Sequence, residues 1–486
     1  MSSYMFSGGE RILLATIVFI YFIFLFLFSL YMNRKTKTYE DYNIAGRSVS
    51  LFPLILTFVG TGVGGSTLLG YMENGYRFGM GQQWINITML MAVIILASFL
   101  LKRIRKLGEK HNMVTVGDYT SLRYGEKARI PTVISFLFAY CAMTGMQFIA
   151  IATILNLTIG LNLTLGIFVG WALLTLKTYF GGLKTVIWHD VVNGTILTIG
   201  MILLFITVLK VTGGWNAISE TASSVNQENM MNIFNIAPSD IFVYLLTLSA
   251  YQFIRQDLWQ RVWAAKNLKT AMNGYWIAMV IAILIGMFAV AIGVFGRYGL
   301  DLGNFDPVLI YYSVIDDVFP FSLVVVMIVV LLAAVISSAD SFLIAGSTSI
   351  ANDIIRPKLK KFDNTRMLFY SRISVLIVSI ISLVLSLTIP GLVNLMVTGT
   401  AMAVSSLLAP VLFGLYWKRV TKAAGVASMW GGLITAVIWQ ISGHPFGLHP
   451  VFIGLPISII ILLTVTFLTK QNNENEELNT KIKIYE

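Results

Sequence analysis

Residues 58–67 read FVGTGVGGST and lie within an apolar run that extends from residue 51 to residue 74. Four glycines and three hydroxyl residues in so short a stretch make a poor uninterrupted helix. If the helix unwinds at membrane depth, its freed carbonyl groups must line a cavity or be buried in protein. Secondary transporters use such breaks to bind ions and solutes. Gly60 and Gly64 also form a GxxxG pattern, which is typical of close helix packing, so both interpretations remain open.

The composition of the whole chain is that of a membrane protein. Of its 486 residues, 57% are hydrophobic and only 12% are charged, and the mean hydropathy is +0.79. These values lie outside the range of soluble domains. The net charge of +11 sits in short connectors, which indicates membrane topology rather than nucleic-acid binding. Cys141 is the only cysteine, so neither a disulfide framework nor a cysteine metal cluster is expected.

Apolar runs of about 20 residues recur along the chain, and each can cross a hydrocarbon core of about 30 Å as a helix. They predict an all-α integral membrane protein that forms one domain over residues 1–486. We expect about thirteen spans, near residues 11–32, 51–74, 79–101, 131–156, 161–178, 185–211, 239–262, 270–297, 318–354, 366–388, 391–416, 421–442 and 450–469.

The connectors alternate between basic and non-basic, and this pattern predicts the orientation. Cytoplasmic loops accumulate Lys and Arg. The connector from Thr212 to Asp240 has neither, so we expect it outside, with the N-terminus outside and a polar, disordered cytoplasmic tail over residues 470–486. The protein is thus expected in the plasma membrane. The basic connectors, expected inside, are those around residues 34–47, 102–110, 356–361 and 418–422.

The ninth span carries a row of small polar residues. At 100° per residue, Ala334, Ser337, Ser338 and Ser341 fall on one helix face, where a carbonyl and several hydroxyls can converge on a hard cation. Neutral oxygens of this kind suit sodium. The alternative is helix–helix hydrogen bonding, worth about 0.6 kcal/mol per bond. The adjacent Asp340 favours a functional role for this face, because an acid inside a membrane span is costly and is therefore a candidate functional residue.

Other ionisable residues also lie in apolar surroundings. Asp190 is either a functional acid or a group close enough to the cytoplasmic edge to be hydrated. Arg255 and Asp257 are two positions apart and would not face each other on a regular helix, so they can pair locally only if that helix is broken.

Several separated motifs resemble the sodium:solute symporter family, and the match covers most of the chain. The stretch from Ala333 to Ser341, together with Val63-Gly64-Gly65, is similar to the branch that holds high-affinity choline transporters. The motifs are Glu40-Asp41-Tyr42 with Ala45-Gly46-Arg47, Gly181-Gly182-Leu183-Lys184 leading to Trp188 and Asp190, Gln260-Arg261 with Ala264-Ala265-Lys266, and Leu415-Tyr416-Trp417-Lys418-Arg419 leading to Gly425.

The resemblance implies a LeuT-type fold with two inverted five-helix repeats. The leading helix would be residues 11–32, the first repeat 51–211, the second repeat 239–416 and the two trailing helices 421–469. It also implies a sodium ion held between the first and eighth core helices. The implied ligands are Gly60, Val63, Ala334, Ser337 and Ser338, while Asp190 and Ser341 are implied in a second sodium site or in coupling.

The substrate positions match the family less closely. Sugar-binding relatives contact their substrate from positions that match Thr67, Asn86 and Arg255, and we include the neighbouring Gln83 and Trp84 in the predicted site. In choline-binding relatives, tryptophans that surround the quaternary ammonium stand at positions that match Gly62 and Arg255. Neither residue is aromatic in this chain, so the resemblance disfavours choline as the substrate. A guanidinium at mid-membrane instead favours a carboxylate, with a structural ion pair as the alternative.

The sequence therefore predicts sodium-coupled uptake of a small organic solute by alternating access. Two alternatives remain: a transporter-like channel or sensor in which sodium switches the conformation, and a proton-coupled symporter that uses Asp190, Asp340 or Glu73. We expect no enzymatic activity, because the chain has neither a G-x-x-x-x-G-K-[ST] loop nor an H-E-x-x-H motif. The expected partners are the solute, sodium and the lipid bilayer, with no obligatory protein partner.

Overall fold

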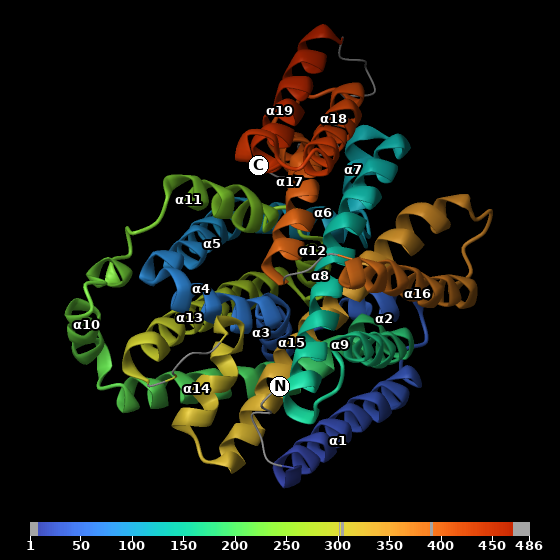
Figure 1. Cartoon of the computed structure of the whole chain (residues 1–486). Coiled ribbons are helices and arrows are strands. Elements are labelled where there is room, and N and C mark those ends of the chain that lie inside the picture. Colours follow the sequence, from blue (N-terminus) through green and yellow to red (C-terminus); the bar gives the residue numbers. More distant parts are fainter. Residues whose placement is uncertain (1–7, 301, 303–305, 389–391, 470–486) are drawn as a thin grey trace.

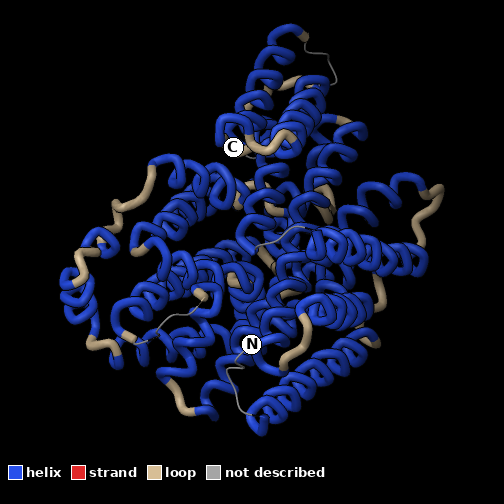
Figure 2. Tube along the Cα trace, in the orientation of Figure 1, coloured by secondary structure: helices blue, strands red, loops and turns tan. Residues whose placement is uncertain are grey.

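The computed structural model describes residues 8–300, 302, 306–388 and 392–469, and the predicted cytoplasmic tail lies outside these residues. The described part of the chain is helical and has no strand (Figure 2). One isolated parallel bridge joins Val49 to Ala265. The all-α prediction is therefore confirmed for these residues.

Ten helices of the described part are long and apolar enough to cross a membrane. A pair of shorter helices that is bent at a break gives an eleventh span if the pair is counted as one. The prediction of about thirteen spans is compatible with this count. The helix over residues 163–211 contains two predicted spans, and the predicted span 239–262 is broken into shorter helices. The long elements are α1 (Gly8–Asn33), α5 (Trp84–Ile95) with α6 (Leu101–Lys110), α8 (Arg129–Ile159), α9 (Leu163–Val211), α13 (Leu268–Gly299), α15 (Phe321–Ser349), α16 (Asn364–Thr388), α17 (Leu392–Tyr416), α18 (Lys422–Ile441) and α19 (Val451–Leu468).

Helix α9 joins the two predicted spans 161–178 and 185–211 in one 49-residue element. Its length would be about 73 Å if it were straight, more than twice the hydrocarbon thickness. It contains a kink at Gly182, where φ is 68° and ψ is 178°. A side chain at Gly182 would also meet the ring of Tyr42 at 2.6 Å, so glycine is required there for both reasons.

The predicted break in the second span is confirmed. Helix α3 (Leu51–Gly62) ends before Val63, which has an extended conformation, and the π-helical turn η2 (Ser66–Gly70) leads into α4 (Tyr71–Phe78). The two halves are bent by 56°. The break leaves carbonyl groups at the end of α3 without the next turn of helix.

The seventh predicted span, residues 239–262, is also interrupted. Helix α11 (Pro238–Tyr244) and the π-helical turn η7 (Leu245–Ser249) precede the break, and α12 (Gln256–Ala264) follows it. Arg255 caps α12 with φ −54° and ψ 115°, outside helical geometry. The structure thus places two broken spans in one bundle.

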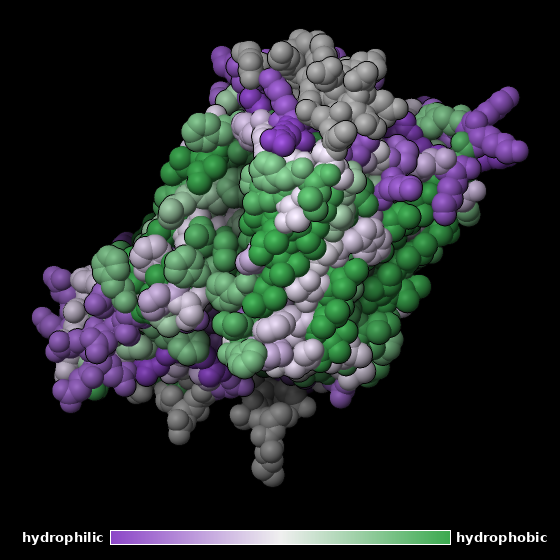
Figure 3. All heavy atoms as spheres, turned by 90° about the horizontal axis from the view of Figure 1, so that it is seen from above, coloured by the Kyte–Doolittle hydropathy of each residue, from purple (hydrophilic) through white to green (hydrophobic). Residues whose placement is uncertain are grey.

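Helix α15 lies at the centre of this bundle, packed against α3, α8, α9 and α16 (Figure 1). Almost every side chain from Val324 to Ser349 is buried. The peripheral helices α1, α18 and α19 expose many apolar side chains instead. Figure 3 shows a broad apolar surface between polar ends, as expected of a protein surrounded by lipid.

Candidate functional site

The break in α3 contacts α15 through glycines. A side chain at Gly60 would place its Cβ 2.2 Å from Ser337 Oγ, and one at Gly64 would place it 2.7 Å from Ser338 Oγ. The GxxxG interpretation is therefore confirmed as a packing contact. The same contact sets serine hydroxyls of α15 against the backbone of the break, so packing and a polar site coexist here.

The predicted sodium residues form a buried polar cluster between α3, α9 and α15. Ser338 Oγ donates to the carbonyl oxygen of Gly60 at 3.0 Å, and Ser337 Oγ donates to Asp190 Oδ1. Ser341 Oγ donates to the carbonyl oxygen of Ser337 at 3.0 Å. Val63, which follows the last residue of α3, and Ala334 on α15 are buried too. Carbonyl and hydroxyl oxygens of this kind are the hard ligands that group 1 and 2 cations prefer.

Asp190 is fully buried, so the interpretation of a hydrated acid near the cytoplasmic edge is wrong. Asp190 lies on the segment of α9 that follows the kink at Gly182, and this helix packs against α3 and α15. Thr57 Oγ1 donates to Asp190 Oδ2 at 2.5 Å, and Arg261 Nη2 lies 3.6 Å from the same oxygen. Hydroxyl donors and a guanidinium together stabilise the buried carboxylate.

Arg261 also belongs to this cluster, and it was not predicted as a site residue. Its Nε donates to Thr57 Oγ1 at 3.0 Å and its Nη2 donates to Ser341 Oγ at 2.5 Å. The signal that points to it is an arginine inside a predicted span, which is costly unless it is paired.

Asp340 belongs to a separate ion pair. Lys177 Nζ donates to Asp340 Oδ2, Thr178 Oγ1 donates to Oδ1 at 2.8 Å, and His189 Nδ1 lies 3.8 Å away. These residues are nearly or fully buried, and Lys177 neutralises the charge of Asp340. The pair joins α9 to α15.

The broken helix before α12 allows the local ion pair that a regular helix would prevent. Arg255 Nη2 lies 2.6 Å from Asp257 Oδ2 and Nε lies 3.2 Å from Oδ1. Tyr140 Oη donates to Asp257 Oδ1 at 2.8 Å, and Arg255 Nη1 donates to Gln252 at 3.3 Å. The guanidinium thus makes three of the five hydrogen bonds that it can donate.

Two small cavities lie beside the break in α3, with volumes of about 60 and 40 Å³. Thr67 and Arg255 line both, and Asn86 lines the smaller one. Three of the predicted substrate residues therefore meet at one place. The walls common to both cavities are Gly62, Thr67, Tyr71, Met89, Gln252 and Arg255.

Gln83 and Trp84 are not among the residues that line these two cavities. Gln83 Nε2 donates to the carbonyl oxygen of Met287 at 2.9 Å, and Trp84 Nε1 donates to that of Ile233 at 3.0 Å. Gln83 also accepts a hydrogen bond from Asn86 at 3.1 Å. Gln83 is therefore connected to the smaller cavity through Asn86.

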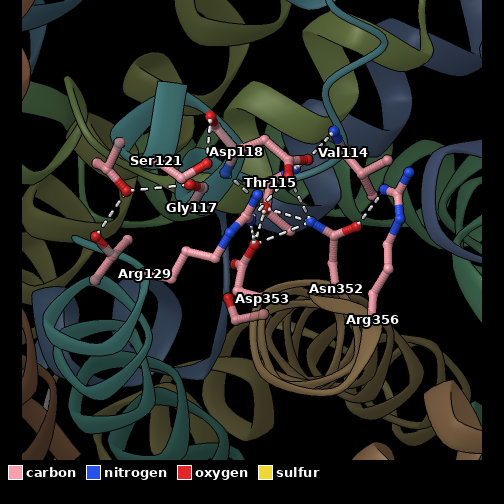
Figure 4. Close-up of polar contacts among 12 residues, drawn as sticks. Val114, Thr115, Gly117, Asp118, Ser121, Arg129, Asn352, Asp353 and Arg356 are labelled. Atoms are coloured by element: carbon pink, nitrogen blue, oxygen red, sulfur yellow. Dashed lines mark hydrogen bonds and ion pairs between the residues drawn. The ribbon is translucent and has the colours of Figure 1, made fainter. Parts of the chain in front are cut away.

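A second polar network lies where α15 continues into the π-helical turn η9 (Ile350–Ile355), and it was not predicted (Figure 4). Arg129 Nη1 pairs with Asp353 at 2.8 Å and with Asp118 at 3.0 Å. The amide nitrogen of Asn352 donates to Thr115, Asp118 and Asp353 at 2.9–3.0 Å. This network ties the end of α15 to α7 (Val116–Tyr124) and to the start of α8.

Similar proteins and structures agree with this architecture. The profile of the sodium:solute symporter family matches residues 42–432. The sodium/proline symporter of Escherichia coli is 26% identical, over 90% of this chain and 89% of that protein, and the high-affinity proline transporter PutP of Bacillus subtilis is 26% identical over 90% and 94%.

Among solved structures, a Na+-coupled sialic acid symporter superimposes with a TM-score of 0.79 at 19% identity, over 95% of this chain and 99% of that one. The nucleobase-cation-symport-1 family transporter Mhp1 superimposes with a TM-score of 0.63 at 15% identity, over 93% and 99%. These similarities confirm the LeuT-type fold that the motifs implied.

The family profile spans most of the chain, and the relatives align over nearly their whole length. The chain belongs to the sodium:solute symporter family and couples the movement of a small organic solute to sodium.

Proposed function

We propose that the solute is a small carboxylate-bearing molecule with an apolar body, of the kind that L-proline represents. The observation that carries this proposal is the position of Arg255, which caps α12 and lines both cavities opposite the broken end of α3. A guanidinium with hydrogen bonds left to donate binds a planar carboxylate well. The two relatives at 26% identity are proline transporters, which supports the same class of solute.

The rest of the cavity wall supports an apolar body rather than a sugar. Met89, Met143, Met146 and Met396 line the larger cavity, and Met279 lines the smaller one. Methionine side chains adapt to irregular apolar shapes. An amine on the solute would face the carbonyl end of α3, which carries the negative end of the helix dipole.

Sodium is proposed to bind between the break and α15, with Gly60, Val63, Ala334, Ser337 and Ser338 as ligands. The direct hydrogen bond from Ser338 to the carbonyl oxygen of Gly60 supports this site, because both oxygens already face each other across the two helices. A sodium ion between them would replace the hydrogen bond and hold α3 against α15. Asp190 then serves coupling, since it accepts the hydroxyl of Ser337.

Transport is proposed to proceed by alternating access in a single domain, with the N-terminus outside and the C-terminus in the cytoplasm. The basic connectors support this orientation. An inside-negative potential then favours inward movement of sodium by about 2.3 kcal/mol per unit charge and 100 mV. We propose the plasma membrane as the location and no enzymatic activity.

Uptake of radiolabelled L-proline into proteoliposomes with an imposed sodium gradient tests this function. We expect sodium-dependent accumulation, and we expect Arg255→Gln to raise the concentration for half-maximal uptake at least tenfold, because truncating one partner of a buried charge pair costs about 2–5 kcal/mol. Arg297→Gln is the matched control, since Arg297 contacts Tyr76 and Gln227 and lines neither cavity. Unchanged proline affinity in Arg255→Gln would exclude the carboxylate assignment.

A further inference from the structure

The amide of Gln147 on α8 has one end paired and the other end free beside the larger cavity. The side chain is fully buried, and it lines the same cavity as Arg255. Its Oε1 accepts a hydrogen bond at 3.2 Å from the backbone N–H of Gly65, in the break that follows α3. Its Nε2 is buried and has no hydrogen-bond partner among the described residues.

The backbone of the break determines which end of this amide is the donor. The N–H of Gly65 can only donate, so it must face the amide oxygen, and the opposite orientation would set two donors against each other. The NH2 group of Gln147 lies beside Gly64, where an added Cβ would be 3.2 Å from Nε2. Because Gly64 also lines the larger cavity, the free donor lies at the cavity wall.

The other side chains of the cavity wall do not satisfy this donor. Three of the hydroxyls that line the cavity each donate to a backbone carbonyl oxygen instead, namely those of Thr61, Ser338 and Thr400. Met143 and Met146, on the same helix as Gln147, offer only thioether sulfurs, which are weak acceptors. A buried donor without a partner is rare and destabilising, so its presence at a cavity wall indicates an acceptor that comes from outside the protein.

A solute that enters this cavity must replace the water that would otherwise accept from Gln147. The cavity of about 60 Å³ has room for about four to six water molecules at 10–15 Å³ each. A solute that displaces them without offering an oxygen leaves the NH2 group unsatisfied and binds less tightly. Because the amide is uncharged, a hydroxyl or carbonyl oxygen suits it better than a second carboxylate, which would need a second cation.

We propose that Gln147 is a specificity-determining residue, whose NH2 group donates to a neutral oxygen of the solute while Arg255 binds the carboxylate. The preferred solute is then a small carboxylate-bearing molecule that also carries a hydroxyl or carbonyl oxygen on its apolar body. The inference rests on the proposed carboxylate site at Arg255 and narrows the class of solute that this site selects.

Sodium-dependent binding of three matched solutes to the purified full-length protein tests this. L-Proline, trans-4-hydroxy-L-proline and 4-oxo-L-proline share the ring and the carboxylate and differ in one neutral oxygen. We expect the two oxygen-bearing solutes to bind the wild type about two- to tenfold more tightly than L-proline, and this ratio should fall to about one in Gln147→Leu. Thr144→Val is the matched control and should keep the wild-type ratio. Thr144 is also fully buried on α8 and its hydroxyl has no partner among the described residues, but it lines neither cavity.

Gln147→Glu is the second variant, because it keeps an oxygen for the N–H of Gly65 and removes the donor. In this variant 4-oxo-L-proline, whose ring oxygen can only accept, should lose its advantage over L-proline. A purely structural role of Gln147 would weaken all three solutes by the same factor. An unchanged ratio in these variants, or no advantage of either oxygen in the wild type, would overturn the inference. Binding of L-proline with an unchanged ratio leaves the carboxylate assignment intact, whereas binding of none of the three solutes overturns both.

Discussion

Replacement of Ser338 by alanine is the sharpest test of the proposed sodium site. The Ser338 hydroxyl is fully buried and lies 3.0 Å from the carbonyl oxygen of Gly60, across the contact between α15 and the break in α3. Without this hydroxyl, sodium loses one of five proposed oxygen ligands. Polar contacts to a charged group are worth about 1.5–3 kcal/mol. Since 1.4 kcal/mol is a factor of ten, the sodium concentration for half-maximal binding should rise about tenfold to a hundredfold.

The assay is 22Na+ binding, supported by the sodium dependence of solute uptake at fixed solute concentration. Ser347→Ala is the matched control on the same helix. Ser347 is equally buried, but its hydroxyl donates to the carbonyl oxygen of Ile344 within α15 at 3.0 Å. Both variants lose one buried hydroxyl, so their stability should fall by a similar amount, about 1 kcal/mol. If Ser338→Ala and Ser347→Ala show the same sodium dependence as the wild type, Ser338 is not a ligand.

Two further substitutions test the packing around this site. Gly60→Ala should abolish sodium-dependent uptake and cost about 1–3 kcal/mol of stability, because its methyl group would collide with a serine hydroxyl of α15. Gly62→Ala is the control and should cost less, because the nearest atom to its methyl group lies 3.6 Å away. Equal thermal stability of the two variants would contradict this prediction. Lys177→Met should destabilise the protein by about 3–5 kcal/mol because it leaves Asp340 buried and unpaired, and the double variant with Asp340→Asn should recover most of that loss in thermal unfolding.

Features that are local in the sequence were predictable. The glycines between Gly60 and Gly65 weaken the helix whatever surrounds them, and the break appears there. The hydroxyl face that includes Ser337 and Ser338 follows from helical periodicity alone. The sequence could not show which helix this face contacts; the family resemblance supplied that pairing.

Contacts between distant residues were not predictable from local pattern. Lys177 and Asp340 are 163 positions apart, and Arg261 and Thr57 are 204 positions apart. A buried arginine can pair with any buried acid, and only the folded arrangement selects one. The burial of Asp190 was missed for a related reason: the basic residues around it suggested a hydrated edge, and only the folded arrangement shows that this part of α9 packs against α3 and α15.

The position of the Arg129 network at the far end of α15 has a mechanical consequence. Ser338 and Asp353 are fifteen positions apart, which corresponds to about 22 Å along the helix axis. A tilt of about 5° around the Ser338 end would therefore shift the Asp353 end by about 2 Å, which is enough to separate hydrogen-bonded atoms. Bonds of 2.7–3.0 Å tie Asn352 and Asp353 to the start of α7 and to α8, and a shift of this size would break them, so that α15 would act as a lever. If sodium binds at Ser338 as proposed, a small adjustment there would be amplified into contact or separation of the Arg129 network at the far end of α15.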